Sequence, residues 1–358
     1  MPHAARPAPT SAAPTAPSTA PSTAPTPLAV DAVLPTTPDT ALWGWFLPHR
    51  EPALEVGSGA VVRIDAVNQA GAAAPGGPLA YFAALGVAAD EVLPELVEVA
   101  ATPRTPGASG HVLTGPVHVA GAEPGDVLQV DVLDVAPRVP YGVNASGHGA
   151  GVLPDLLDAP SVRLLRLDEA GTHYEFGHGI RVPAAPFAGI MAVAPPDDAV
   201  PAGGVVSANP PDRWGGNMDV KDLVAGTTLY LPVFQPGAQL YVGDTHGAQG
   251  HGEVNQTAVE HSMALTVRCT VRKDLRLTWP RVETPDRLLA MGAHADLDVA
   301  LRVAVTEAIA LLRERTGGAL SPADAYALCS IAVDFVVAEA VDGNQLVTAS
   351  VPKALLAG

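Results

Sequence analysis

The sequence has few cysteines, few charges and no long hydrophobic run. Its two cysteines, Cys269 and Cys329, are too few in 358 residues for a disulfide framework or a cysteine-rich zinc site. No run of 18 or more apolar residues occurs, so we expect no transmembrane helix and no membrane partner. A basic region followed by an apolar stretch is missing at the start of the sequence. We therefore expect no secretory signal and a cytoplasmic protein.

The charge balance and the missing motifs exclude several function classes. There are 20 Lys and Arg against 37 Asp and Glu, a net charge of −17, which opposes a nucleic-acid partner. The sequence has no G-x-x-x-x-G-K-[ST] phosphate loop and no G-x-S-x-G nucleophile elbow. Neither cysteine has a histidine arrangement typical of a thiol nucleophile. These absences set aside a nucleic-acid partner and the phosphate-loop, serine-elbow and cysteine-nucleophile schemes.

The composition favours a turn-rich, mainly β fold. Apolar residues make up 48% of the chain, enough for a packed core, and 35 glycines and 36 prolines exclude a long helical bundle. We expect a disordered Pro/Ala/Ser/Thr tail at residues 1–27, because it has no large side chains to bury. A β-rich catalytic body follows at 28–272, and a smaller α/β portion at 273–358 packs on that body. The tail should contribute neither activity nor stability.

Alternating apolar residues predict strands in the body. Leu265–Arg272 alternates strictly, which places Cys269 on the buried face as a small core residue. The turn Glu123–Asp126 precedes the alternating segment Val127–Leu133 and indicates a hairpin.

The last third of the sequence changes to helical spacing. Apolar residues predict a helix from Asp296 to about Arg315, which Gly317 and Gly318 end. Ser321 followed by Pro322 predicts the start of a second helix that runs to about Val341 and contains Asp334. A buried carboxylate in that helix would need a partner, so Asp334 is a minor site candidate. A final strand is expected from Gln345 to Val351.

The segment richest in chemistry is Trp214–Glu260. Two strand patterns, Thr227–Val233 and Ala238–Gly243, are separated by a Pro-Gly turn, so we expect them to pair as an antiparallel hairpin. The start of the first strand and the end of the second strand lie at the same end of a hairpin. Asp219 should therefore lie close to the segment that contains Asp244.

A carboxylate, an imidazole and a second carboxylate follow the second strand. Asp244 and His246 are two residues apart, so they point to the same side of an extended chain. Gly247 begins a glycine-rich loop, and Glu253 lies just beyond this loop. Such groups suit a divalent ion or acid–base work, and amide hydrolysis would use both. The alternative interpretation is a glycine-rich turn with surface acids.

Other histidines give weaker signals. His111 precedes a turn and is equally compatible with a site and with a structural loop. Five more histidines have no evident partner, and we expect them at the surface: His173, His178, His251, His261 and His294.

Four segments together resemble the acetamidase/formamidase family. They are GGNMDVKDLVAGTTLYLPVFQPGAQLYVGDTHGAQGHGEV, GHVLTGPVHVAGAEPGDVLQVDVLDV, PFAGIMAVAP and ADAYALCSIAVDFVVAEAVDGNQLVTASVPKALL. The resemblance extends from about Trp43 to the end of the sequence. It implies a β-rich, jelly-roll or sandwich-like body with an α/β portion, and hydrolysis of formamide or acetamide to ammonia and a carboxylic acid. It also implies a homo-oligomer and a divalent metal ion, with zinc expected and calcium as the alternative.

The family motifs also suggest roles for individual residues. We expect the metal ligands to be Asp219, Asp244 and His246. Catalytic roles are expected for Glu253 as acid/base, with Gln249 and His246. Substrate contacts are expected from Asn217, His111 and Gly247. A competing hypothesis from another class is a non-catalytic protein that binds a small ligand on the same fold; it predicts that the acids and the histidine do not share one cleft.

Overall fold

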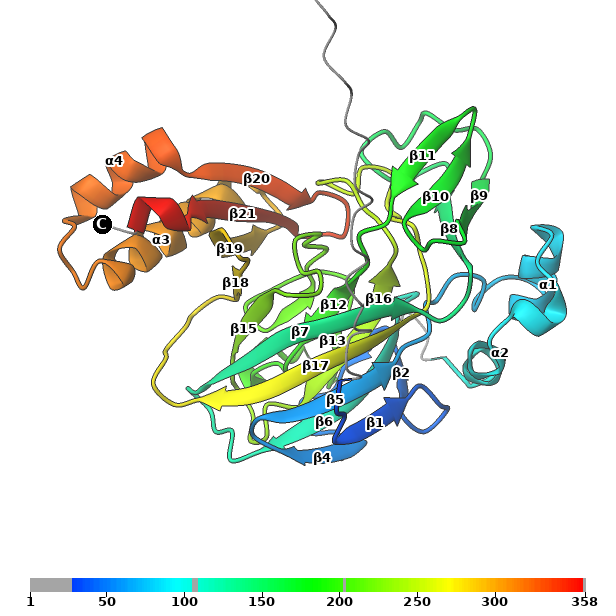
Figure 1. Ribbon diagram of the computed structural model, residues 1–358, viewed down its shortest axis with the longest axis horizontal. Helices are drawn as coiled ribbons and strands as arrows, with labels where there is room; N and C mark the ends of the chain where they lie inside the picture. Colours follow the sequence, from blue (N-terminus) through cyan, green and yellow to red (C-terminus); the bar gives the residue numbers. More distant parts are fainter. Residues whose placement is uncertain (1–27, 105–108, 202–203, 357–358) are drawn as a thin grey trace, which may run out of the picture.

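The computed structural model describes residues 28–104, 109–201 and 204–356, so the predicted tail at residues 1–27 lies outside the described residues. Within these ranges the largest sheet has nine strands (Figure 1). In spatial order they are β1 (Ala32–Pro35), β5 (Ala60–Asp65), β17 (Met263–Arg272), β7 (Val127–Pro137), β15 (Thr228–Pro232), β18 (Arg281–Glu283), β19 (Arg287–His294), β21 (Gln345–Pro352) and β20 (Asp334–Glu339).

The other described strands form three smaller sheets. A six-stranded sheet contains β14 (Gly215–Asn217), β12 (Phe187–Ala192), β16 (Leu240–His246), β6 (Val112–Ala120), β2 (Ala41–Trp43) and β4 (Leu54–Gly57). A four-stranded sheet contains β11 (Ile180–Pro183), β10 (His173–Gly177), β9 (Ser161–Leu167) and β8 (Tyr141–Ser146). A short pair contains β13 (Val206–Ser207) and β3 (Trp45–Phe46).

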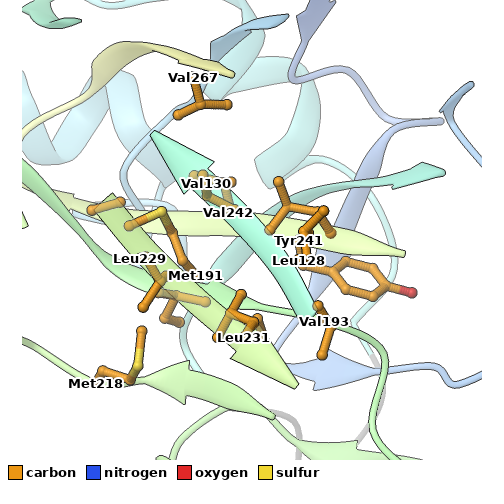
Figure 2. Packing of buried hydrophobic residues seen from close by; sticks show 14 of the residues in the cluster. Leu128, Val130, Met191, Val193, Met218, Leu229, Leu231, Tyr241, Val242 and Val267 are labelled. Atoms are coloured by element: carbon orange, nitrogen blue, oxygen red, sulfur yellow. The ribbon is translucent and has the colours of Figure 1, made fainter. Parts of the chain in front are cut away.

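The main core lies between the nine-stranded and six-stranded sheets. Leu128, Leu229 and Val267 come from the first sheet and pack with Met191 and Val242 from the second (Figure 2). All five side chains are buried. The two facing sheets exclude water from one shared apolar layer, and the central strands β12 and β16 are buried at every position. The mainly β, sandwich-like fold is therefore confirmed.

The strand predicted at 265–272 is confirmed within β17. Leu265, Val267 and Cys269 are buried, whereas Arg268 on the opposite face is exposed. Cys329 is also buried, in the second core beneath the C-terminal helices. Burial raises the pKa of the Cys269 thiol to about 12, which suits a core residue rather than a nucleophile.

Both predicted hairpins are wrong in their pairing. β15 pairs with β7 and β18, whereas β16 pairs with β12 and β6 in the other sheet. The turn Glu123–Asp126 forms, but it joins β6 to β7, again in different sheets. Crossing from one sheet to the other allows both strands to bury apolar faces in the same core from opposite sides. A turn sequence alone does not distinguish this crossing from a hairpin.

The described helices lie in two places (Figure 1). α1 (Gly77–Ala84), α2 (Pro94–Ala100) and the 3₁₀ turn Ala89–Glu91 pack beside β2 and β8 through a separate apolar cluster. α3 (Leu297–Arg315) and α4 (Pro322–Ala332) pack on β19 and β21. Two more 3₁₀ turns are Asp197–Ala199 and Lys353–Leu356. None of the helices in the described ranges combines the length and apolarity needed to cross a membrane.

The C-terminal elements confirm one predicted helix and correct the other. α3 begins where Asp296 caps it, and β21 matches the predicted final strand. The second helix ends at Ala332 instead of Val341, because the β-branched run after Val333 forms β20 beside β21. Asp334 is consequently exposed at the start of a strand and lies 3.2 Å from Arg287. Because β19–β21–β20 extends the nine-stranded sheet, the domain boundary at residue 272 stays a prediction.

Candidate active site

Asp219 and His246 are brought together through β12. This central strand pairs with β14 on one side and with β16 on the other. The Asp219 N–H donates to the Gly189 carbonyl at 3.2 Å, and Asp219 Oδ1 lies 3.8 Å from His246 Nδ1. The predicted convergence of these segments is confirmed, although a shared neighbour strand produces it instead of a hairpin.

Three site acids have unusual backbone conformations. Asp219, Asp244 and Glu253 have φ values of 49°, 47° and 44°, in the left-handed region that non-glycine residues rarely occupy. Such conformations cost roughly 1–3 kcal/mol each and persist where the surrounding structure imposes them. Their concentration at one place indicates that the fold positions these side chains for function.

His246 lies between two groups of carboxylates. On its Nδ1 side is Asp219, and Glu253 belongs to the same group. On its Nε2 side, Asp244 Oδ1 lies at 3.3 Å and Glu260 Oε1 at 3.5 Å. In each group the possible ligand atoms lie within 4.8 Å of one another, close enough to share a cation. Asp244 and His246 thus point to the same side, as predicted.

Gln249 determines which nitrogen of His246 faces the possible cation ligands Asp244 and Glu260. Its amide N–H donates to the Asp219 carbonyl oxygen at 2.9 Å, so its Oε1 is left to accept from His246 Nδ1 at 3.0 Å. The Nδ1 proton therefore points at Gln249, and Nε2 faces Asp244 and Glu260. A histidine oriented in this way is typical of a metal ligand.

Several buried polar atoms of the described residues have no hydrogen-bond partner. They include both carboxylate oxygens of Asp219 and His246 Nε2. Both residues are fully buried. A buried carboxylate without a partner costs several kcal/mol, and a bound cation removes that cost. The donor set, carboxylate oxygens with one imidazole nitrogen, fits a divalent ion.

The pKa shifts of the site also favour cation binding. Burial and the neighbouring carboxylates of Glu253 raise the pKa of Asp219 well above its usual value. Burial likewise raises the pKa of Glu260 to about 7. Burial opposes a charged His246, but Asp244 and Glu260 outweigh it and raise the pKa of His246 to about 10. Asp219 and Glu260 therefore favour the protonated form, whereas the neighbouring His246 lowers the pKa of Asp244.

A cavity of about 450 Å³ opens onto this centre. Its lining includes Asp244, Glu253 and Glu260, and also His111, whose Nε2 lies 3.7 Å from Asp244 Oδ2. Asp219, His246 and Gln249 do not line it but lie beneath these acids. The volume lies within the usual range for small-molecule sites. A small molecule can thus contact carboxylates that the buried imidazole holds in place.

The structure adds residues that sequence reasoning missed. Asn68 donates to Glu260 Oε2 at 2.7 Å, and Gln69 donates to Asp244 and Glu260. Asp342, from the loop between β20 and β21, lines the cavity from the C-terminal portion. Only Glu260 had a detectable signal, an acid directly after the apolar pair Ala258–Val259. The others lie far away in the sequence from the glycine-rich loop.

Two of the expected substrate contacts do not line the cavity. Asn217 is fully buried and donates to Asp342, so it supports a cavity residue. Gly247 donates its N–H to Val259 O at 2.7 Å, which leaves this N–H unavailable to a substrate oxygen. His111 does line the cavity. The roles of all three stay predictions.

His261 corrects one expectation. It is buried instead of exposed, accepts from Tyr174 through Nδ1 at 2.7 Å, and donates through Nε2 to Val139 O at 2.7 Å. Burial lowers the pKa of His261 to about 4, so the ring stays neutral. It follows Glu260 directly and packs edge-on against Tyr174, which indicates a structural role.

The fold and the site geometry define a class of protein: a β-sandwich with a buried centre of carboxylates and one imidazole. Comparison with known proteins identifies the family. The model of the Acetamidase/Formamidase family matches residues 106–202 and 198–357. This match extends over more than half of the chain, which therefore belongs to the acetamidase/formamidase family.

Individual relatives agree with this assignment. The acetamidase of Mycolicibacterium smegmatis is 32% identical over an alignment of 202 residues, with coverages of 40% of this chain and 49% of the relative. The formamidase of Methylophilus methylotrophus is 30% identical over 217 residues, with coverages of 46% and 52%. The chain thus spans about half the length of these curated relatives. The crystal structure of an acetamidase from Bacillus halodurans has a TM-score of 0.73 at 26% identity, covering 90% of this chain and 98% of that one.

Proposed function

We propose that this protein is an amidohydrolase that cleaves short aliphatic amides, such as formamide and acetamide, to ammonia and a carboxylic acid. The observation that supports this most directly is the cavity lined by Asp244, Glu253 and Glu260 above the buried His246. Family membership supports the same chemistry. The cavity is large enough for a small amide together with water.

We further propose that the centre binds a divalent cation, with zinc as the first choice. Asp244, Glu260 and His246 Nε2 would hold it at the cavity floor, and Asp219 on the other edge of the ring is the remaining predicted ligand. A bound divalent ion would supply Lewis acidity and lower the pKa of water. Gln249 would keep the Nδ1 proton away from the cation side of the ring.

Glu253 is the proposed acid/base. It lines the cavity and is only 6% exposed, and burial together with Glu260 and Asp244 raises its pKa well above the usual value. In the proposed reaction Glu253 takes a proton from water, whose oxygen adds to the amide carbonyl carbon. It then returns the proton to the nitrogen as the C–N bond breaks, which releases ammonia and the acid. A positioned base of this kind contributes about 10²- to 10⁴-fold.

The test is ammonia release from formamide and acetamide by the full-length protein. Asp244→Asn and Glu253→Gln should each lower kcat at least 100-fold, whereas the exposed control Asp134→Asn should not. A chelator should remove activity, and zinc should restore it better than calcium. If acetamide binds without ammonia release, the protein is a non-catalytic binding protein. If Asp244→Asn stays within a few-fold of the wild type, the assigned site is wrong.

The cytoplasmic location and the homo-oligomer stay predictions. The second can be measured directly by sedimentation equilibrium of the full-length protein.

A further inference from the structure

An apolar groove lies beside the catalytic cavity. It has a volume of about 500 Å³ and is lined mainly by Val152, Leu153, Leu156, Leu157 and Val254. None of the described residues that line it is charged. Three residues, Ser146, Ala150 and Asn255, line both the groove and the catalytic cavity. The groove therefore adjoins the catalytic cavity.

The side chains of this groove are unusually exposed for their type. Val152, Leu153, Leu156 and Val254 are 52%, 65%, 69% and 63% exposed. Single exposed apolar residues are common, but a cluster of four large ones at the edge of a polar cavity indicates a binding surface. Water leaves this surface when an apolar ligand group covers it, which favours binding.

Backbone contacts hold the groove in a defined position relative to Glu253. Val254 follows Glu253 directly, and its carbonyl accepts from the Val152 N–H at 2.9 Å. Ser146 Oγ donates to Asn255 O at 3.1 Å. Gly151 permits this close approach, because its φ is +71° and a Cβ there would lie 2.6 Å from the Val254 carbonyl oxygen. The apolar residues of the groove and the proposed acid/base Glu253 therefore lie on two segments that hydrogen bonds hold together.

We propose that this groove binds the acyl chain of the substrate, so that the protein prefers amides with an extended apolar acyl group over formamide and acetamide. The proposal rests on the proposed amidohydrolase function. The amide group would lie among Asp244, Glu253 and Glu260, and the chain would extend past Ala150 toward Leu153. Because each buried methylene is worth a roughly fourfold change in an equilibrium constant, kcat/KM should rise with chain length until the groove is filled.

The experiment compares kcat/KM for acetamide, butanamide and hexanamide in three proteins. In the wild type, kcat/KM should rise by roughly fourfold for each added methylene. The double variant Leu153→Ser/Leu156→Ser should lose most of this rise. Its kcat/KM for acetamide should stay within a few-fold of the wild-type value. Ile331→Ser removes a comparably exposed apolar side chain, 80% exposed on α4, and should keep the full rise.

The outcomes separate this inference from the proposed function. Acetamide hydrolysis with a flat chain-length profile would overturn the groove alone. So would a smaller oligomer in the double variant with an unchanged profile, because a second copy of the chain would then cover this surface. Calorimetry of hexanoate against acetate gives a readout without turnover: tighter hexanoate binding in the wild type than in the double variant supports the groove. Such binding without hydrolysis of any amide would contradict the proposed function only.

Discussion

The C-terminal helices and the His246 centre differ in how well their polar groups are satisfied. In the helices the orphan backbone groups have partners: Asp296 accepts from two N–H groups at the start of α3, and Ser321 accepts from Asp324 N at the start of α4. At the His246 centre the backbone is left-handed at three acids, and both oxygens of Asp219 have no described partner. Local contacts therefore stabilise the helices, whereas the centre holds buried charged groups and strained backbone that lower stability.

The largest effect expected from this contrast comes from Gly189→Ala. A Cβ there would lie 2.9 Å from His246 Cε1 and 3.0 Å from the Asp244 carbonyl oxygen, and also against Asp219 Oδ1. These groups must move apart, and a misplacement of about 1 Å can cost about 100-fold in rate. We expect kcat/KM for acetamide to fall at least 100-fold.

Gly250→Ala is the matched control for this substitution. Among the described residues, no atom lies within 4 Å of an added Cβ at Gly250, so activity should stay within a few-fold. If both variants lose activity equally, the close packing around Gly189 is not what positions the centre.

Gln249→Leu should have the next largest effect. It removes the acceptor that holds the Nδ1 proton of His246 and the donor to the Asp219 carbonyl. Loss of such a supporting contact typically lowers metal affinity or activity 10- to 100-fold. Competition with a chromogenic chelator measures the zinc affinity directly. An unchanged affinity with an unchanged rate would show that the ring orientation does not depend on Gln249.

Glu339, at the end of β20, pairs with Gly252 in an isolated bridge beside the site and should show a pH effect. Its Oε1 accepts from Val341 N and Asp342 N, while its buried Oε2 has no partner among the described residues. Burial raises the pKa of Glu339 to about 8 from the ordinary value of 4.5. The folded state therefore keeps a proton that the unfolded state has lost, so the wild type should lose stability as pH rises from about 4.5 to 8.

The variant Glu339→Gln lacks this titration and sharpens the comparison. Its unfolding free energy should exceed that of the wild type at pH 8 by on the order of 4 kcal/mol, and the difference should shrink toward pH 4.5. Urea unfolding in the presence of a chelator measures this at both pH values. The exposed Glu169→Gln should show no such trend. Parallel pH curves for wild type and Glu339→Gln would contradict the assigned burial effect.

The smallest effect is expected in the helices. Asp296→Ala removes the cap of α3, which should lower the unfolding free energy by about 1 kcal/mol. Because α3 packs on β19 and β21 away from the cavity residues, kcat/KM should not change. A loss of activity at unchanged stability would show that the two regions are coupled.

Local patterns predicted the elements whose environment is local. Helical spacing of apolar residues located α3, and the cap and proline signals located the start of α4. Strict alternation located β17 and the burial of Cys269. The predicted end of α4 was wrong, because residues 334–339 form β20 and pair with β21. Helical spacing in the sequence does not reveal this pairing. The same limit applies to β15 and β16, whose turn is compatible with a hairpin and with a crossing between sheets.

The candidate site shows the same division. The motif around Asp244 indicated the correct neighbourhood, since Asp244, His246 and Asp219 do converge. Glu260, Asn68 and Asp342 were missed because their approach depends on how separate sheets and the C-terminal hairpin pack. Likewise, His261 was expected at the surface, and only the packing of Tyr174 against it explains its burial.

By itself the sequence determined that this is a turn-rich β chain with a glycine-flanked cluster of acids and one histidine, because alternation, caps and turns act over a few residues. Only the tertiary structure decided that β12 unites the cluster, that His246 faces a different pair of acids from each edge of its ring, and that an apolar groove adjoins the cavity. These features depend on contacts between segments up to about 190 residues apart, such as Asn68 with Glu260, and burial in a shared core determines those contacts.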